Sequence, residues 1–477
     1  MLSFLVSILS IAASVAFAGG SSNSNRIDTR TPRFRFGRPA SFVAATSTAT
    51  ADAIDSTTSS TNTNTWEDLQ NAIALDESEN ENKNEPVLTF YRDTNGWCPF
   101  CERVWVCIRA KNLPYQERLI SLQNKPDWYK EMVPTTQVPA LLFHNSNSDD
   151  KNSRKLVWDS LDIMKALDDM FPDTPQLVLD THEYKEASEM NALLNKVGFA
   201  FVYATGGLES SGDGEQEQKQ EQELSLSEKK QEFLQELDRL EQAIVGPFRL
   251  GQEFTGVDAE MIPSLERWRY QLPLSKGVDI LENRPVLAKW FEAMESYAPF
   301  AERAGGDEYS WVATSAMFAR FFGKEGDPAT IATIEKSESA AMALMDGFKD
   351  AVKENECHGK FALEAAAKVI SNHEAIAKDC TNPDPKSQQN ISRAGSVESA
   401  EKMLLAVARM LLKEDNAIQE AKSCLLEDMG VGDDERLDAA KAAKTVATRL
   451  CTPRDMSAPA AKILRAVLMI VAERLEE

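Results

Sequence analysis

The stretch that decides the fold runs from Val87 to Cys101 and reads Val-Leu-Thr-Phe-Tyr-Arg-Asp-Thr-Asn-Gly-Trp-Cys-Pro-Phe-Cys. The apolar residues 87–91 predict a buried strand, and Thr-Asn-Gly after Asp93 predicts a loop. A helix is expected from about Cys101 to Lys111, where apolar residues recur at helical spacing. The two cysteines of the C-P-F-C motif therefore lie between a strand and a helix.

Working outward from this motif, short strands and helices alternate in a mixed order. Strands are predicted over 116–121, 140–143 and 156–158, and helices over about 126–132 and over 160–170. The polar segment 145–154 reads as a long connection between two of the strands. Successive β-α-β and β-β-α units predict a thioredoxin-like α+β domain.

The C-P-F-C motif has the features of a reactive thiol site. Cys98 falls at the amino end of the helix, where free backbone N–H groups and the helix dipole favour an anion. Such positions lower a cysteine pKa from about 8.5 into a range of roughly 3.5 to 7.5. Pro99 suits the first helical position because it has no N–H to leave unpaired. Cys98 is therefore the predicted nucleophile, and Cys101, one turn deeper, the predicted resolving thiol.

Two alternatives for the motif were weighed against this interpretation. Half of a zinc site is disfavoured because no second cysteine pair follows at metal spacing, so no metal is expected. A permanent structural disulfide is disfavoured equally. Cys107 lies on the apolar stripe of the same helix and is expected to be a small core residue.

Composition limits the classes of function. The chain has 477 residues, with 75 acidic side chains against 52 Lys and Arg, and a net charge of −23. This balance disfavours a polyanionic partner such as nucleic acid. At roughly 100–200 residues per domain the length allows two to four domains. The seven cysteines are few and uneven, which favours reactive chemistry over a disulfide scaffold.

From about residue 181 the apolar residues recur only at helical spacing. Phe233, Leu237, Leu240 and Ile244 form one such stripe, with Ser225 and Glu228 as a predicted capping box before it. The segment 209–223 reads as a solvated loop. Later stripes comprise Ala400, Leu404, Val407 and Leu411, and then Ile463, Val467, Ile470 and Val471.

These patterns predict an organisation in successive parts. A helix and acidic linker (66–85) precede the thioredoxin-like domain (86–175), an all-α domain (180–305) and an all-α extension of unknown role (306–477). His358 beside Cys357 is interpreted as structural.

The amino-terminal region has the composition of targeting segments. Residues 1–16 form an apolar run ending in small residues, as in a signal peptide, and residues 17–65 are rich in Arg, Ser and Thr, as in a transit peptide. The combination resembles the bipartite plastid presequence of algae with secondary red plastids. It predicts a location in the plastid stroma, with secretion as the alternative. No membrane span is expected in the mature chain.

Two further motifs accompany the cysteines. Pro139, within Gln-Val-Pro-Ala before a strand, is a candidate for a cis peptide bond. Asp159 and Ser160 end a strand and open a helix, where they can meet a ligand with an amine and a carboxylate. The γ-glutamyl end of glutathione is such a ligand.

With these motifs the sequence resembles the cysteine-type glutathione transferases, which include the omega, lambda and dehydroascorbate-reductase classes. The resemblance covers about residues 86–303 and includes the segments 122–130, 250–259 and 284–291. It implies that glutathione is the co-substrate. The implied glutathione-binding residues are Phe100, Lys125, Val138, Pro139 (cis), Asp159 and Ser160. The usual acid before the serine is Glu, so Asp159 departs from the pattern.

The second cysteine narrows the resemblance, because most omega and lambda members have a small residue in place of Cys101. The C-P-x-C form resembles the iota class of photosynthetic organisms, which has a long carboxy-terminal extension, and the membrane-associated prostaglandin synthase type. We rank the iota-like interpretation first.

The leading functional prediction is a glutathione-dependent thiol transferase or reductase that acts on glutathionylated or oxidised small substrates. A non-catalytic module that binds a ligand or a partner protein is the alternative. A prostaglandin-synthase-like protein, or one that binds a cluster or heme at C-P-F-C, ranks lower. A homodimer is left open.

Overall fold

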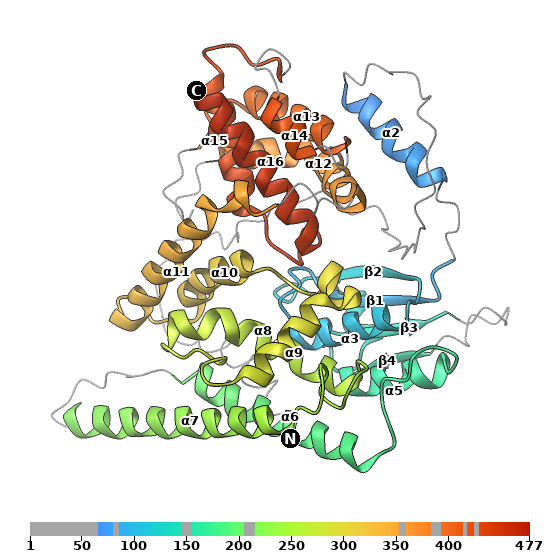
Figure 1. Cartoon of the computed structure of the whole chain (residues 1–477), viewed down its shortest axis with the longest axis vertical. Helices are drawn as coiled ribbons and strands as arrows, with labels where there is room; N and C mark the ends of the chain where they lie inside the picture. The colour runs from blue at the N-terminus through green and yellow to red at the C-terminus, as the bar shows by residue number, and fades with distance from the viewer. Residues whose placement is uncertain are drawn as a thin grey trace.

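The computed structural model describes residues 65–79, 85–144, 155–204, 215–352, 359–382, 393–413, 417–423 and 429–477 (Figure 1). The targeting segments expected over residues 1–65 (apart from Thr65), the connection 145–154 and the Cys357–His358 pair lie outside the described residues. Within them, no helix is long and apolar enough to cross a membrane.

The amino-terminal part of the described chain is a sheet covered by helices, as the sequence predicted. Its elements follow in the order β1 (Leu88–Asp93), α3 (Pro99–Ala110), β2 (Tyr115–Ile120), α4 (Asp127–Met132), β3 (Ala140–Phe143), β4 (Leu156–Trp158) and α5 (Ser160–Met170). The observed bounds differ from the expected ones by no more than about two residues, as is usual for helix ends.

The sheet has the strand order β2-β1-β3-β4. β1 runs parallel to β2 and antiparallel to β3, which is antiparallel to β4. Every residue of β1 is buried, including the polar Thr89, Arg92 and Asp93. A thioredoxin-like α+β domain therefore precedes the mostly helical remainder, and the predicted fold class is confirmed.

The next part of the chain is helical. It contains α6 (His182–Val202), α7 (Glu215–Ala243), α8 (Gly256–Ser275), α9 (Pro285–Ser296) and the π-helix η2 (Phe300–Ala304). The predicted stripe on α7, from Phe233 to Ile244, is buried. α8 begins with a capping box, in which the Thr255 hydroxyl and Asp258 carboxylate bond each other's backbone N–H groups.

One expectation for α7 was wrong. Ser225 does not cap a helix start, because α7 begins ten residues earlier and residues 215–223, expected as part of a loop, are helical. The physical reason is their composition. Glu, Gln and Lys are strong helix formers, so the helix extends through a segment whose low complexity suggested a loop.

The carboxy-terminal extension forms a second, separate hydrophobic core. Its elements are α10 (Glu308–Phe322), α11 (Pro328–Asp346), η3 (Phe348–Asp350), α12 (Gly359–Thr381), α13 (Val397–Leu411), α14 (Ala417–Ser423), α15 (Arg436–Arg449) and α16 (Ala458–Glu476). Both predicted stripes, on α13 and α16, are buried. The early helix α2 (Trp66–Glu79) packs on this core, with Trp66 stacked on His373 at 3.9 Å between ring centroids.

Candidate active site

Strand register brings three motifs together at one end of the sheet: C-P-F-C, Val138–Pro139 and Asp159–Ser160. Because β3 is antiparallel to β1, its first residue, Ala140, pairs with Tyr91 near the end of β1. Trp158, the last residue of β4, pairs with the same Ala140. The loop after β1, the loop before β3 and the start of α5 therefore meet, although they are spaced across about 60 residues of sequence.

Cys98 is the N-cap residue of α3, with Pro99 at the first helical position. Its side chain is half-buried, and its carbonyl accepts the first helical hydrogen bond, from Glu102 N–H at 3.1 Å. The Cys98 thiol donates to the Val138 carbonyl at 3.9 Å. The thiol thus lies at the helix end whose unpaired N–H groups favour an anion, beside the loop that precedes β3.

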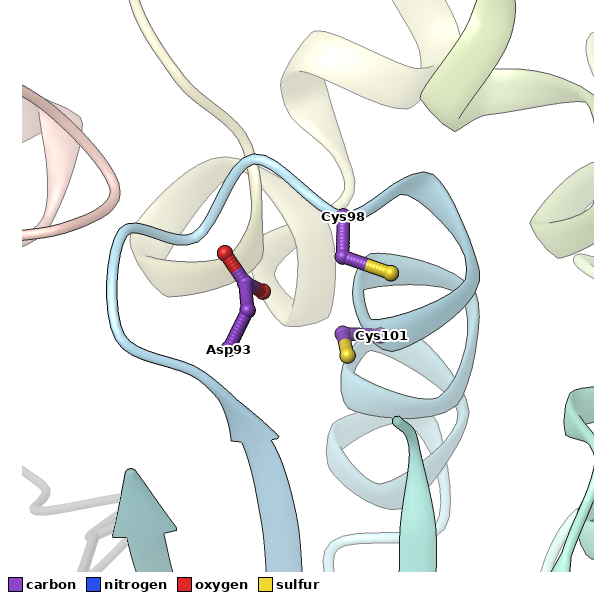
Figure 2. Close-up of side chains that lie close together, drawn as sticks. All are labelled: Asp93, Cys98 and Cys101. Carbon is purple, nitrogen blue, oxygen red and sulfur yellow. The ribbon is translucent and has the colours of Figure 1, made fainter. Parts of the chain in front are cut away.

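Cys101 lies one turn deeper and is 1 % exposed. Figure 2 shows its sulfur below that of Cys98, with the Asp93 side chain to one side of them at the end of β1. One ligand atom of each of the three residues lies within 4.8 Å of the others. Burial raises the pKa of the Cys101 thiol well above its usual value, and the neighbouring Cys98 adds to this.

Asp93 is a site residue that the sequence analysis did not identify. Asp93 is buried, with 1 % of its surface exposed, and one oxygen of its carboxylate accepts from Trp97 N–H at 2.8 Å. The other oxygen is buried without a hydrogen-bond partner. Two sulfurs and a carboxylate are donor types that metals can bind, so the donor set itself is compatible with a metal as well as with proton transfer.

The loop before β3 has the geometry expected from its sequence. The Val138–Pro139 peptide bond is cis. Tyr129, buried in α4, donates its hydroxyl hydrogen bond to the Gln137 carbonyl at 2.6 Å and so supports the loop from below. The backbone of Val138 thereby lies next to Cys98, and its carbonyl accepts from the Cys98 thiol.

Asp159 and Ser160 both take part in contacts within the protein. Asp159 is the N-cap of α5, with φ 76°, and its carboxylate accepts from the N–H groups of Leu161 and Asp162 at 2.9 and 3.5 Å. The Ser160 hydroxyl accepts from Arg103 at 2.8 Å. Its own proton is left to donate to a ligand.

Arg103, on α3, is a second residue that the sequence analysis missed. It is buried, and burial lowers the pKa of its guanidinium from the usual value. Besides Ser160 it donates to the Glu260 carbonyl at 3.4 Å and lies over the Phe100 ring at 5.5 Å. A buried positive charge under the start of α5 favours the binding of an anionic group there.

Phe100 and Lys125 are both half-buried. Phe100 follows Pro99 in the first turn of α3. Partial burial lowers the pKa of Lys125, while the charge of Cys98 acts in the opposite direction, which places the amine in the electrostatic neighbourhood of the thiol. Contacts or electrostatic interactions thus link Cys101, Lys125 and Val138 directly to Cys98.

The three remaining described cysteines are buried and do not take part in the site. Cys107, Cys380 and Cys451 are buried. Burial raises the pKa of each thiol, to about 12 for Cys380. Buried, protonated thiols are poor nucleophiles, which agrees with the structural role expected for Cys107.

An ion pair fixes α3 to α8 behind the thiol. Arg267 donates to the Glu102 carboxylate at 2.6 Å and to the Trp97 carbonyl at 3.0 Å. Burial raises the pKa of Glu102, and the charge of Arg267 opposes this. No local sequence signal links these residues, because they come from different parts of the chain.

Comparison with known proteins places this geometry in a family. Residues 97–170 match the model of the glutathione S-transferase amino-terminal domain. Glutathione S-transferase L1 of Arabidopsis thaliana is 32 % identical over 219 residues, covering 44 % of this chain and 80 % of the relative. Glutathione S-transferase L2, chloroplastic, of the same plant is 30 % identical over 236 residues, covering 47 % and 70 %.

Among solved structures, the dehydroascorbate reductase of Chlamydomonas reinhardtii is similar at 23 % identity and a TM-score of 0.34, covering 46 % of this chain and 92 % of that one. The identity to the two plant relatives extends over most of their length and over less than half of this chain. The chain therefore belongs to the glutathione S-transferase family.

Proposed function

We propose that this glutathione S-transferase is a thiol transferase or reductase in which Cys98 is the nucleophile and glutathione the co-substrate. One observation carries the proposal. Cys98 lies at the start of α3, half-exposed and next to Val138, while a second thiol lies beneath it. A hydroxyl that could activate glutathione is not needed in such a reaction, so conjugation to electrophiles is expected to be weak.

The first step is a thiol–disulfide exchange. The Cys98 thiolate attacks the sulfur of a glutathionylated substrate, a bond forms between Cys98 and glutathione, and the substrate leaves as a thiolate that takes up a proton. In the monothiol route, the thiolate of a second glutathione then attacks the adduct. Oxidised glutathione forms and Cys98 is restored, so each turnover consumes one free glutathione molecule, the other half of the oxidised glutathione coming from the substrate.

In the dithiol route, Cys101 attacks Cys98 instead. A disulfide forms between Cys98 and Cys101, and glutathione is released. Two further glutathione molecules reduce this disulfide and leave as oxidised glutathione. The short distance between the two sulfurs supports this route.

The surrounding residues have complementary proposed roles in holding glutathione. The Val138 backbone next to cis-Pro139 would bond the cysteinyl part of the tripeptide. The Ser160 hydroxyl and the start of α5, with Arg103 behind them, would bind the γ-glutamyl carboxylate. Lys125 would contribute a positive charge, and Phe100 would line the pocket.

The test is the Cys98→Ser variant, assayed on the mixed disulfide of glutathione and 2-hydroxyethanethiol. Activity should fall at least about 10³-fold, because the hydroxyl is a poor nucleophile at neutral pH. Cys107→Ser, which alters a buried thiol on the same helix, is the matched control and should stay active. Retained activity in Cys98→Ser would remove the proposal.

A Cys101→Ser variant separates the two routes. If turnover uses one thiol, the variant keeps its activity on the small mixed disulfide. If turnover uses both, the variant accumulates the glutathione adduct on Cys98, which mass spectrometry of the intact protein detects.

A binding module is the second candidate, and a specific feature favours it. A cavity of about 630 Å³ lies between the transferase part and the extension, lined by aromatic side chains that include Tyr270, Phe291 and Phe300 from one side and Tyr309 and Phe348 from the other. An apolar ligand suits such a lining. This candidate predicts that an apolar fluorescent dye binds equally to Cys98→Ser and to the wild type, with no turnover of disulfide substrates by either.

A visible absorption spectrum of the purified protein tests the third candidate, a cluster or heme bound at C-P-F-C.

Finer assignments are also proposals. The C-P-F-C motif and the long extension support an iota-like class. Targeting to the plastid stroma rests on the sequence of residues 1–65, and the chloroplastic plant relative is in keeping with it. Fusion of residues 1–65 to a fluorescent protein in a diatom tests the targeting: secretion of the fusion would exclude the plastid. Light scattering of the purified chain tests whether it forms a homodimer.

A further inference from the structure

The loop that presents Cys98 has few hydrogen bonds to support it. This active-site loop, residues 94–97, connects the end of β1 to the N-cap of α3. Thr94 N–H donates to the Ile120 carbonyl at 3.1 Å, Trp97 N–H donates to Asp93, and the Trp97 carbonyl accepts from Arg267 at 3.0 Å. Gly96 has a φ of 67°, a conformation that glycine adopts without strain. Contacts from other parts of the chain therefore matter for where the loop lies.

Two residues of the carboxy-terminal extension pack against this loop. The ring of Phe318, on α10, meets the Trp97 ring edge to face, with 5.4 Å between centroids and 82° between planes. Pro453, in the loop between α15 and α16, closes over Gly96: a β-carbon at Gly96 would lie 3.1 Å from the proline Cγ. In Figure 1, α10 lies between α8 and α11 and so joins the extension to the transferase part.

Hydrogen bonds fix the position of Pro453 and of its neighbour Thr452. Arg303 donates to the Pro453 carbonyl at 2.6 Å and lies over the ring of Trp105, on α3, at 4.4 Å. Next to Pro453, the Thr452 hydroxyl donates to Asp307 at 2.8 Å, and Arg465 of α16 donates to the same carboxylate at 2.7 Å. The loop 450–457 is thus tied to α3, to the start of α10 and to α16.

We propose that the extension is a part of the active site, in which Phe318 and Pro453 hold Gly96 and Trp97 and thereby position the Cys98 thiol. Phe318 is a positioning residue, since it acts through the ring of Trp97. The inference rests on the proposed function of Cys98. Its physical basis is the sensitivity of thiol exchange to the alignment of three sulfur atoms, since a displacement of about 1 Å can cost about 10²-fold in rate.

The proposal predicts a split in the kinetic constants. The groups proposed to hold glutathione lie on other loops, at Val138 and Ser160, whereas the ring of Phe318 packs on Trp97. A Phe318→Ala variant of the full chain should therefore lower kcat by about tenfold and leave the KM for glutathione within about twofold. The assay is turnover of the mixed disulfide of glutathione and 2-hydroxyethanethiol.

Phe321→Ala is the matched control, because Phe321 lies on the same helix three residues later and is 52 % exposed. It should keep the wild-type kcat. Phe318→Tyr, which keeps the ring, should restore most of the kcat lost in Phe318→Ala. Equal kcat in Phe318→Ala and Phe321→Ala, or a rise in KM alone, would overturn the proposal.

Two measurements keep the result interpretable. Phe318→Leu fills most of the space without the ring, so it should lose less kcat than Phe318→Ala and can be measured even if circular dichroism shows that Phe318→Ala folds poorly. If both variants fold and both keep the wild-type kcat, the result counts against the proposal. Cys98→Ser measured alongside separates the two ideas. If it retains activity, the proposed function fails. If it is inactive while Phe318→Ala behaves as Phe321→Ala, only the positioning role fails.

Discussion

At the scale of the residue, we expect the Asp93 carboxylate to accept the proton of the buried Cys101 thiol. Because burial raises the pKa of Cys101 well above its usual value, the thiol is protonated at neutral pH. Attack on a Cys98 adduct then requires a proton acceptor. The Asp93 carboxylate has an oxygen without a hydrogen-bond partner and lies within 4.8 Å of the sulfur atoms.

We therefore expect Asp93→Asn to slow closure of the Cys98–Cys101 disulfide by about 10²-fold, since general base catalysis contributes about that much. The measurement is a single turnover: Cys98 is first converted to a mixed disulfide with a coloured thiol, and release of that thiol is followed without glutathione. The rate in the wild type should still rise above pH 8, because the raised pKa keeps the thiolate scarce there.

Asp127→Asn, on the exposed start of α4, is the control and should close at the wild-type rate. In the Cys101→Ser background, Asp93→Asn should have little effect on the first attack by Cys98. A slowing of that attack equal to the slowing of closure would contradict the role of Asp93 as a base for Cys101.

At the scale of the element, α8 depends on one buried carboxylate at its start. Asp258 accepts from the N–H of Thr255 at 2.9 Å, from the N–H of Arg249 at 2.7 Å and from the Trp290 indole at 2.9 Å. Burial raises the pKa of Asp258, and these hydrogen bonds oppose the rise. The helix it starts carries Arg267, which bonds the carbonyl before Cys98.

Asp258→Ala should lower the free energy of unfolding by about 3–5 kcal/mol, because it removes a cap and leaves three buried donors unpaired. Asp327→Ala is the comparison: Asp327 caps α11 through Thr330 in a more exposed setting, and its loss should cost about 1 kcal/mol. Urea unfolding of both variants measures the difference. Equal losses would show that Asp258 acts as an ordinary cap.

At the scale of the whole molecule, a buried ion pair joins Asp307, which caps α10, to Arg465 on α16. Burial alone would raise the pKa of Asp307, but Arg465 and hydrogen bonds from Ser310 and Thr452 hold it below its usual 3.8. A carboxylate with a lowered folded-state pKa stabilises the fold above its unfolded pKa. That stability is lost as the pH falls through the folded pKa.

Asp307→Asn should therefore destabilise the chain by about 3 kcal/mol at pH 7, as expected for breaking a buried pair. The difference from the wild type should shrink as the pH falls below about 4. Urea unfolding at pH 7, 5 and 3.5 measures it. A difference that is the same at every pH would mean that the charge of Asp307 contributes nothing.

The sequence by itself determined the features that depend on residues close together in the chain. The strand, loop and helix around C-P-F-C, the position of Cys98 at a helix start and the buried stripes of α7, α13 and α16 all follow from local spacing, because backbone periodicity decides which side chains share a face. The length of α7 was misjudged for a related reason: low complexity hid good helix formers.

Only the tertiary structure decided which distant residues meet the thiol. Asp93 carries no sign in the sequence that its carboxylate lies close to Cys101, and Arg103 none that it reaches Ser160. Phe318 contacts Trp97 across more than 200 residues of chain. Such contacts result from the packing of whole helices and from strand register, and no short-range period in a sequence encodes them.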